Sequence, residues 1–179
     1  MQNAIVTRRE TANTLQKYKE ITMDRQAEGF LLMKDGSWQT VLPGQCEKTP
    51  ENALCLLAIR RKAEYGHAAG AGGIAWRGKT VGGWGEFSCR LLSARRFVEK
   101  HKDALLGGMP AEEVLNQTVR DALREAFESA WKEIPDVQDG LQPLLALRCV
   151  NTVSARLMDC GWQLTDFRLK HVQIQKEAV

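Results

Sequence analysis

The spacing of the apolar residues changes in the middle of the chain, and this change constrains the fold more than any other feature of the sequence. From Ile21 to about Cys89, short apolar runs alternate with turn residues, which indicates β-strands. Beyond Ser93 the apolar residues recur at intervals of three and four, which indicates amphipathic helices. A final apolar segment then indicates one more strand. Strands, then helices, then a strand predict an α+β protein.

The first half contains one strong hairpin signal. The apolar residues 30–33 and 38–42 flank the turn Lys34–Ser37, and its Asp-Gly pair favours a tight turn because glycine accepts a positive φ. Pro43 and Gly44 then end the second strand.

Further strands are predicted at residues 53–60 and 83–92, in one sheet with the hairpin. The glycine-rich residues 66–85 lie between them and hold too many glycines for a helix. We interpret them as loops that join a short strand near residues 74–76.

Three helices are predicted in the second half. Ser93 caps a short helix that ends at Gly107 and Gly108. A helix of about six turns runs from Pro110 to Ile134, and its apolar positions are Val114, Leu115, Val119, Ala122, Leu123, Ala126, Phe127, Ala130 and Trp131. A third helix runs from about Leu141 to Asp159, with Leu144, Leu145, Val150, Val153, Leu157 and Met158 expected to point inward.

The third helix and the last strand meet at a glycine. Gly161 is expected to close the helix at the C′ position, where a left-handed conformation is common. The final strand runs from Trp162 to Ile174. Its apolar phase slips near Asp166 and near Lys170–His171, which predicts two β-bulges.

The length of 179 residues fits one domain or two tightly fused subdomains. Residues 1–19 are polar and basic, and we interpret them as an N-terminal arm that is in part helical. A β-rich subdomain at 20–107 and an α/β subdomain at 108–179 are expected to follow. In the second subdomain the two long helices are expected to pack side by side and against the final strand, burying Phe127 and Trp131.

The charge balance and the cysteines argue against several classes of protein. The 25 Lys and Arg residues against 22 Asp and Glu residues give a net charge of +3, which is too even to indicate nucleic-acid binding. Five cysteines without a Cys-x-x-Cys pair predict neither a zinc knuckle nor a disulfide framework. No apolar run approaches the roughly 20 residues of a membrane-spanning helix. We therefore expect a cytoplasmic protein, soluble or peripheral at the inner face of the membrane.

Glycines and a cysteine could each suggest chemistry. The cluster Gly66, Gly70, Gly72 and Gly73 could cradle a phosphate, but no helix follows it, as a dinucleotide site requires. Cys89 could be a thiol nucleophile beside His67 or His101. It alternates with Phe87 and Leu91 on one strand face, however, which is the position of a core residue.

Histidines and carboxylates give no stronger signal. The three histidines, His67, His101 and His171, share no spacing typical of a metal site. Glu112, Glu113 and Asp121 are expected on the solvent side of a helix. The sequence therefore predicts no catalytic, cofactor-binding or metal-binding residue.

A pair of tryptophans suggests a surface. Trp76 and Trp84 lie near cations and apolar residues, and the group comprises Ile74, Trp76, Arg77, Lys79, Val81 and Trp84. Amphipathic aromatic side chains beside cations suit a membrane interface or a partner surface. The alternative is that the tryptophans cap the core of the sheet.

Four consecutive segments carry a resemblance to a known superfamily. They are the hairpin of residues 28–45, the strand and short helix of 82–101, the long helix of 110–127, and the helix end, glycine and strand of 150–174. In this order and spacing, residues 20–179 resemble the SPFH (stomatin, prohibitin, flotillin, HflK/C) or band 7 superfamily. The resemblance implies the two fused subdomains described above.

The resemblance also implies a function. Members of the superfamily are non-enzymatic scaffolds that organise membrane microdomains and chaperone or restrain membrane proteases. For this chain it implies a homo-oligomer that contacts a membrane surface, a membrane protein or another protein partner. The hydrophobic anchor and the coiled coil that usually flank such domains are not found in the sequence, so we expect a minimal domain or a fragment of a longer protein. The alternative function is a soluble protein-binding adaptor of a phage, prophage or defence locus, and an enzyme is the third possibility.

Overall fold

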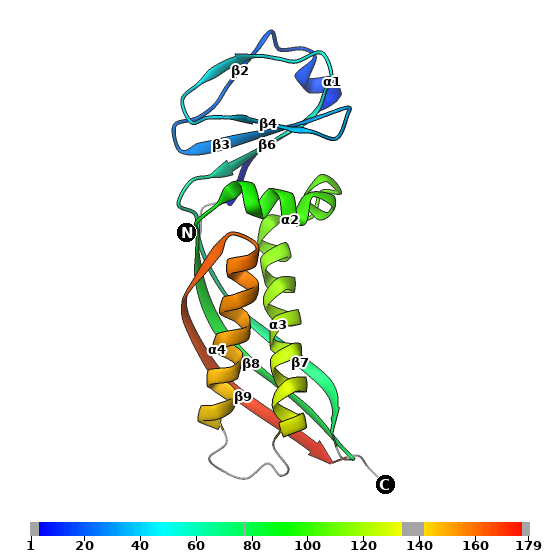
Figure 1. Cartoon of the computed structure of the whole chain (residues 1–179), viewed down its shortest axis with the longest axis vertical. Helices are drawn as coiled ribbons and strands as arrows, with labels where there is room; N and C mark the ends of the chain where they lie inside the picture. The colour runs from blue at the N-terminus through cyan, green and yellow to red at the C-terminus, as the bar shows by residue number, and fades with distance from the viewer. Residues whose placement is uncertain (1–3, 77, 134–141, 177–179) are drawn as a thin grey trace.

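Two units stacked along the long axis make up the molecule (Figure 1). The computed structural model describes residues 4–76, 78–133 and 142–176. The upper unit contains β1 (Val6–Thr11), α1 (Ala12–Leu15), β2 (Glu20–Thr22), β3 (Ala27–Met33), β4 (Trp38–Val41), β5 (Cys46–Lys48) and β6 (Ala53–Arg60). The lower unit contains β7 (Glu64–Trp76), β8 (Lys79–Leu91), α2 (Ala94–Leu106), α3 (Ala111–Glu133), α4 (Gln142–Asp159) and β9 (Trp162–Lys176). The fold is therefore α+β, as predicted.

The hairpin of the upper unit is confirmed as β3 and β4, which pair antiparallel. In its turn the Asp35 carboxylate accepts hydrogen bonds from the Ser37 amide at 2.9 Å and from the Ser37 hydroxyl at 2.6 Å. Gly36 has a φ of +81°, which is the left-handed conformation that the Asp-Gly signal predicts. The predicted strand at 53–60 is also confirmed, as β6.

Residues 6–11 form an edge strand rather than part of a separate arm. They pair antiparallel with β6, in a sheet of order β1-β6-β3-β4. Most of their side chains are polar, and the half-buried Arg8 and Glu10 form an ion pair with each other. Pairing with a distant strand decides the structure here, so a segment without an apolar face still becomes a strand. The helical part of the expected arm is the single turn α1.

The glycine-rich stretch contains a strand of 13 residues, β7, where the sequence predicted loops around a short strand. Alternate residues such as Tyr65 and Ala69 are buried, and a bulge lies between Ala71 and Ile74. Small residues are needed because a Cβ at Gly70 would lie 3.0 Å from the Cβ of Trp84 on the neighbouring strand. The high glycine content argued against a regular element at the sequence level. In the structure, however, the close pairing of β7 with β8 requires small residues on β7.

The prediction that residues 83–92 share a sheet with the hairpin is wrong. β8 pairs with β7 and β9 in a separate sheet of order β7-β8-β9. Residues 64–91 therefore belong with the long helices, whereas the sequence placed them in the β-rich subdomain of 20–107. Short apolar runs alone do not specify which strands pair. Here β8 pairs with β7 because the two follow each other in the chain and form a long hairpin.

The predicted helices are confirmed as α2, α3 and α4. The Ser93 hydroxyl caps α2 by accepting a hydrogen bond from the Arg96 amide at 3.3 Å. Both predicted bulges of β9 occur, because its register with β8 shifts between Leu164 and Asp166 and again between Leu169 and His171. The ends of the expected helices at Ile134 and Leu141 lie outside the described residues.

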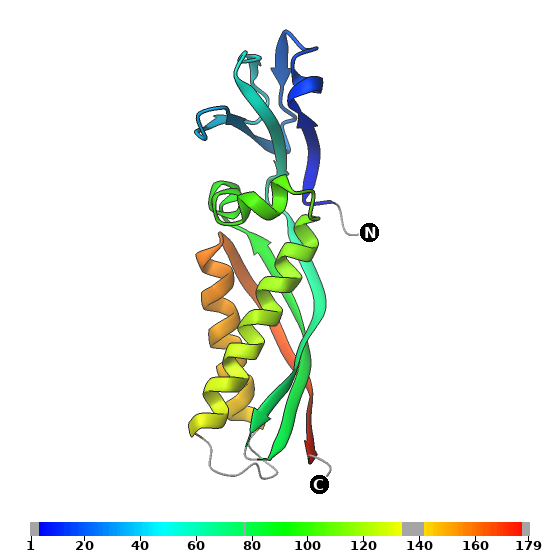
Figure 2. The ribbon, with the colours of Figure 1, turned by 90° about the vertical axis from the view of Figure 1, so that its right-hand side faces the viewer.

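The two long helices lie side by side and cover one face of the lower sheet (Figure 2). α4 packs on β9 as expected, but α3 packs chiefly on β7. Phe127 is fully buried, as predicted, whereas the side chain of Trp131 lies outside the described residues. On α4 the predicted inward residues Leu145, Val153 and Leu157 are buried.

The prediction that Leu144 and Met158 of α4 point inward is wrong. Leu144 is 58% exposed and Met158 is 40% exposed. The buried residues Leu145, Cys149, Val153 and Leu157 recur every four residues, so the side that faces α3 and the sheet is narrower than the sequence pattern suggested.

One core joins the two units through α2. Phe30 and Leu57 of the upper sheet point toward α2 and belong to the same buried cluster as the residues of the lower unit. Their neighbours Leu31 and Leu56 point to the opposite face of the sheet, where a second cluster fills the space under β2, β5 and α1. The four-stranded sheet is thus buried on both faces.

Candidate interaction surface

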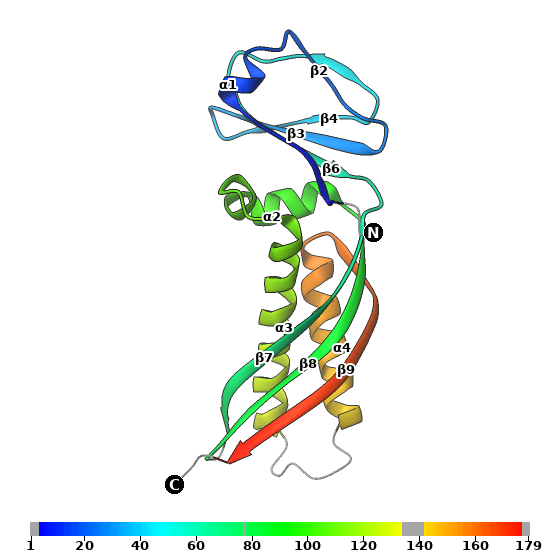
Figure 3. The same cartoon turned by 180° about the vertical axis from the view of Figure 1, so that it is seen from behind.

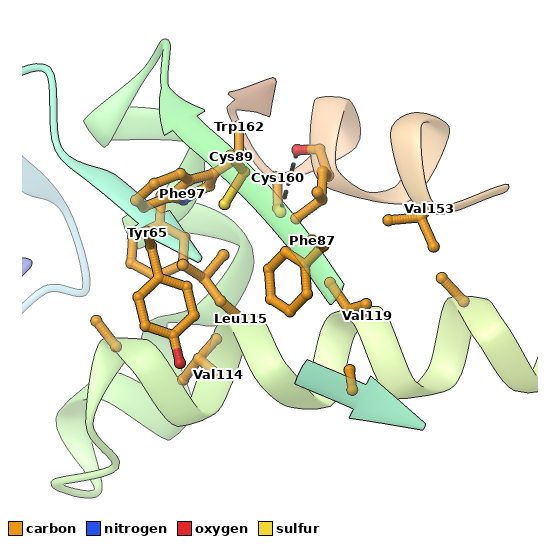
Figure 4. Packing of buried hydrophobic residues seen from close by; sticks show 14 of the residues in the cluster. Tyr65, Phe87, Cys89, Phe97, Val114, Leu115, Val119, Val153, Cys160 and Trp162 are labelled. Atoms are coloured by element: carbon orange, nitrogen blue, oxygen red, sulfur yellow. Dashed lines mark hydrogen bonds between the residues drawn. The ribbon is translucent and has the colours of Figure 1, made fainter. Parts of the chain in front are cut away.

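The cysteine singled out in the sequence is a core residue. Cys89 lies among Phe87, Trp162 and Cys160 in the packing shown in Figure 4. Burial, and secondarily the neighbouring Cys160, raises the pKa of the Cys89 thiol to about 12. A thiol with this pKa stays protonated near neutral pH, so it is unsuited to nucleophilic attack.

The three histidines lie on three different elements, His67 on β7, His101 on α2 and His171 on β9. His67 is exposed on β7, with its ring centroid 6.2 Å from that of Tyr65. His101 lies in a kink of α2 and packs on Phe97 at 5.4 Å between ring centroids. Burial, and secondarily the charge of Lys100, lowers the pKa of His101. Within the described ranges, no three His, Cys, Asp or Glu residues come together as metal ligands would.

The glycine cluster does not form a phosphate-binding loop. Gly66, Gly70, Gly72 and Gly73 lie within β7, and the strand continues to Trp76 without a helix N-terminus. The carbonyl oxygen of Gly72 accepts a hydrogen bond from Arg124 of α3 at 3.2 Å. Gly66 and Gly70 let β7 pair closely with β8, since a Cβ at these positions would lie 2.9 Å from the Ser88 hydroxyl and 3.0 Å from the Trp84 Cβ, respectively.

The three carboxylates of α3 that the sequence singled out form contacts within the fold. Glu112 accepts a hydrogen bond from the Ile5 amide at 3.1 Å and ties the start of β1 to the helix. Glu113 forms an ion pair with Arg120 at 2.9 Å. Asp121 accepts a hydrogen bond from Gln117 at 2.8 Å. Glu112 and Glu113 are half-buried rather than on the open solvent side, and only Asp121 is exposed as predicted.

The tryptophan-centred group of the sequence does not form one surface. Ile74 and Val81 pair across the β7–β8 ladder and are buried in the core. Trp84 is 43% exposed on the opposite face of β8, because successive residues of a strand point to alternate faces. The side chain of Trp76, and Arg77 as a whole, lie outside the described residues.

Trp84 instead belongs to the outer face of the lower sheet, which the helices leave uncovered (Figure 3). It lies between Gly70 of β7 and His171 of β9. Lys170 and Glu86 form an ion pair there at 3.0 Å. Among the described side chains, this face is thus a polar sheet surface on which Trp84 is the large exposed aromatic residue.

A charged hollow of about 330 Å³ lies between α2, α3 and α4. Lys100 binds Asp159 at 2.7 Å, and Arg156 binds Glu125 at 2.6 Å. These cations and carboxylates neutralise one another across the three helices. The exposed ion pairs around the hollow therefore link α4 to α2 and to α3.

Of the leucines that the structure describes, the two most exposed lie on α4. Leu144 and Leu147 are 58% and 57% exposed, and they line a hollow of about 250 Å³ beside α3 together with Ala130, Glu133, Arg148 and Asn151. The apolar spacing predicted that Leu144 lies in the core, and Leu147 was not among the predicted inward or surface residues. The available signal for an exposed stripe was the seven-residue repeat of Leu144, Asn151 and Met158, with Leu147 three residues after Leu144.

Comparison with models of known protein families and with curated proteins found no match to this sequence. None of the helices within the described part of the chain combines the length and the apolar composition that crossing a membrane requires.

Proposed function

We propose that this chain is an SPFH or band 7-type scaffold domain without enzymatic activity. It acts through self-association and through contact with a membrane surface or a protein partner. The proposal rests on the resemblance of residues 20–179 and on the order of elements in the lower unit. In that unit a strand leads into a short helix, two long helices and a final strand, which is the order of the last three of the four resembling segments.

The junction between α4 and β9 is the observation that carries the proposal. Gly161 has a φ of +83°, and its carbonyl oxygen accepts hydrogen bonds from the amides of Leu92 and Ser93 at 2.9 and 3.0 Å. The junction therefore joins the end of β8, the start of α2 and the start of β9. The superfamily pattern has a glycine at the corresponding point, between the helix end and the final strand.

The polar groups of the molecule favour a scaffold over an enzyme. The charged side chains around the hollow of α2, α3 and α4 are occupied in ion pairs with one another. Burial raises the pKa values of Cys89 and Cys149 to about 12 and of Cys160 to about 11. These groups contribute to stability and have properties unsuited to acid–base or thiol chemistry near neutral pH.

Sedimentation and vesicle flotation test the proposal. We expect the isolated chain to associate reversibly with rising protein concentration. We also expect weak binding to anionic vesicles that decreases with salt, because exposed cations contribute about 1 kcal/mol each near such a surface. A chain that stays monomeric and does not bind vesicles at any salt concentration would contradict the scaffold function and favour the protein-binding adaptor.

A further inference from the structure

The exposed face of α4 carries an apolar stripe that is symmetric along the helix. The stripe consists of Leu144, Leu147, Asn151, Ala155 and Met158, all of them exposed. At about 100° per residue these five positions fall on one side of the helix. Asn151 is the centre: Leu144 and Met158 lie seven residues from it, and Leu147 and Ala155 lie four residues from it.

This symmetry suits a second copy of the same helix in the opposite direction. With the two Asn151 residues facing each other, Leu144 of one copy meets Met158 of the other, and the large Leu147 meets the small Ala155. The amide of asparagine both donates and accepts hydrogen bonds, so two facing Asn151 side chains complement each other. A residue at a two-fold axis must be self-complementary in this way.

The charges beside the stripe are already neutralised within one copy. Arg148 forms an ion pair with Glu133, and Arg156 binds Glu125 through two nitrogens at 2.6 and 3.0 Å. Both arginines thus bind to α3, leaving the stripe without a charge of its own. Two such surfaces meet without repulsion. A helix that lies on an anionic membrane would instead present free cations along its apolar side.

We infer that this stripe is the face on which two copies of the chain associate, with their α4 helices antiparallel and Asn151 near the two-fold axis. The hollow of about 250 Å³ between α3 and α4 lies beside Leu144 and Leu147, where it can receive side chains of the second copy. The inference names a surface for the self-association in the proposed function, and in that respect it rests on it.

The length of the stripe sets the strength of the contact. Fourteen residues of helix between Leu144 and Met158 span about 21 Å, and a helix about 10 Å wide then offers roughly 200 Å² of surface per copy. Specific interfaces bury about 800 Å² per partner. The contact of two isolated chains is therefore weak, reversible and dependent on protein concentration, and it lasts longer where several copies are linked or concentrated on one surface.

Sedimentation velocity of the whole chain over a concentration series tests the inference. The double variant Leu144→Ser, Leu147→Ser should raise the dissociation constant at least about tenfold, since it removes most of the apolar area that the stripe buries on association. Leu42→Ser is the matched control, because Leu42 is 49% exposed on the upper unit, and it should leave the constant unchanged. Asn151→Leu should lower the constant, because a polar residue at the centre of an apolar contact reduces its stability. Far-UV circular dichroism checks that each variant folds.

Cysteine cross-linking tests the position of the axis. In a Cys46→Ser background, which removes the exposed native thiol, Asn151→Cys should form a disulfide-linked dimer under mild oxidation. Gln117→Cys on the exposed side of α3 should not. Equal cross-linking of both would contradict the two-fold axis at Asn151.

The outcomes separate the surface from the proposed function. If the wild-type chain associates and the double variant associates equally well, the stripe is not the interface, while scaffolding through another face stands. If neither the wild type nor Asn151→Leu associates at any concentration, both the surface and the self-association fail. If the double variant loses only its binding to anionic vesicles, the stripe binds membrane and the inference is overturned.

Discussion

Gly161 offers the sharpest test of how the lower unit is held together. Its φ of +83° lies in the left-handed region, which costs any other residue except asparagine roughly 1–2 kcal/mol. A Cβ at this position would also lie closer than 3.0 Å to the carbonyl oxygen of Ser93. That oxygen belongs to the backbone, so the Gly161→Ala variant must displace the chain at the start of α2.

The displacement strains two further interactions. The amides of Leu92 and Ser93 both donate to the Gly161 carbonyl oxygen, and a hydrogen bond of this kind contributes roughly 0.5–1.5 kcal/mol to stability. Together with the left-handed conformation, Gly161→Ala should lower the free energy of unfolding by about 3 kcal/mol. In urea, with a slope of about 2 kcal/mol per molar, the midpoint should fall by about 1.5 M.

Gly36→Ala is the matched control. Gly36 has nearly the same φ, +81°, but a Cβ there would meet nothing within 4 Å. Only the conformational cost applies, so the urea midpoint should fall by about 0.5 M. Asparagine separates the two effects further. Because it tolerates the left-handed conformation, Gly36→Asn should be nearly neutral, while Gly161→Asn keeps the clash and stays destabilising. Midpoints that fall equally for Gly161→Ala and Gly36→Ala would refute the close approach at Ser93.

Three further predictions concern the core, the thiols and pH. Phe127→Ala should lower the free energy of unfolding by about 3–5 kcal/mol, because the ring is fully buried against β8; a loss below about 1 kcal/mol in a urea titration would contradict this packing. A thiol reagent should label Cys46 in the folded protein but reach Cys89, Cys149 and Cys160 only on unfolding, since burial raises their pKa values to about 12, 12 and 11; rapid labelling of all of them would be contrary to this. His101 has a pKa below its ordinary value of 6.5 because of burial, so the unfolded chain takes up a proton first and stability should fall as the pH drops below 6.5, with no such loss above it. His101→Gln should remove this part of the pH dependence, and identical urea midpoint profiles between pH 7.5 and 5.5 for wild type and variant would show that His101 does not cause it.

Local signals predicted the elements whose structure is decided locally. The Asp-Gly turn predicted the β3–β4 hairpin because the backbone of Gly36 and the side chain of Asp35 determine the turn by themselves. Gly161 predicted the helix end for the same reason. The slips of apolar phase in β9 predicted both bulges because each slip moves the apolar side chains to the other face of the strand unless one extra residue is inserted.

Elements that depend on distant partners were missed. β1 has few apolar residues and becomes a strand only because it pairs with β6, about 50 residues further along the chain. The glycines of β7 argued against a strand, although the pairing with β8 and the Trp84 side chain require small residues there.

On the candidate surface, the angular position of each residue around its helix or strand determines whether its side chain is exposed or buried. Leu144 and Leu145 are adjacent in the sequence and differ by about 100° around the helix, so one is exposed and the other is buried. In the same way Val81 and Trp84 fall on opposite faces of β8. Apolar composition finds such residues, but only the packing partner decides which of them remain on the surface.

The two bulges of β9 affect how the protein behaves when it is crowded. β9 is an edge strand of the lower sheet, and an uninterrupted edge of 15 residues would offer a template for open-ended sheet growth. The extra residues Thr165 and Lys170 break the regular array of backbone donors and acceptors at two points along this edge. At high local concentration the two bulges therefore hinder edge-to-edge pairing of β9 strands from different copies, which would otherwise lead to fibrils. Deleting Thr165 or Lys170 would straighten the edge, and we expect such variants to precipitate or form thioflavin-binding aggregates at concentrations where the wild-type chain stays in solution.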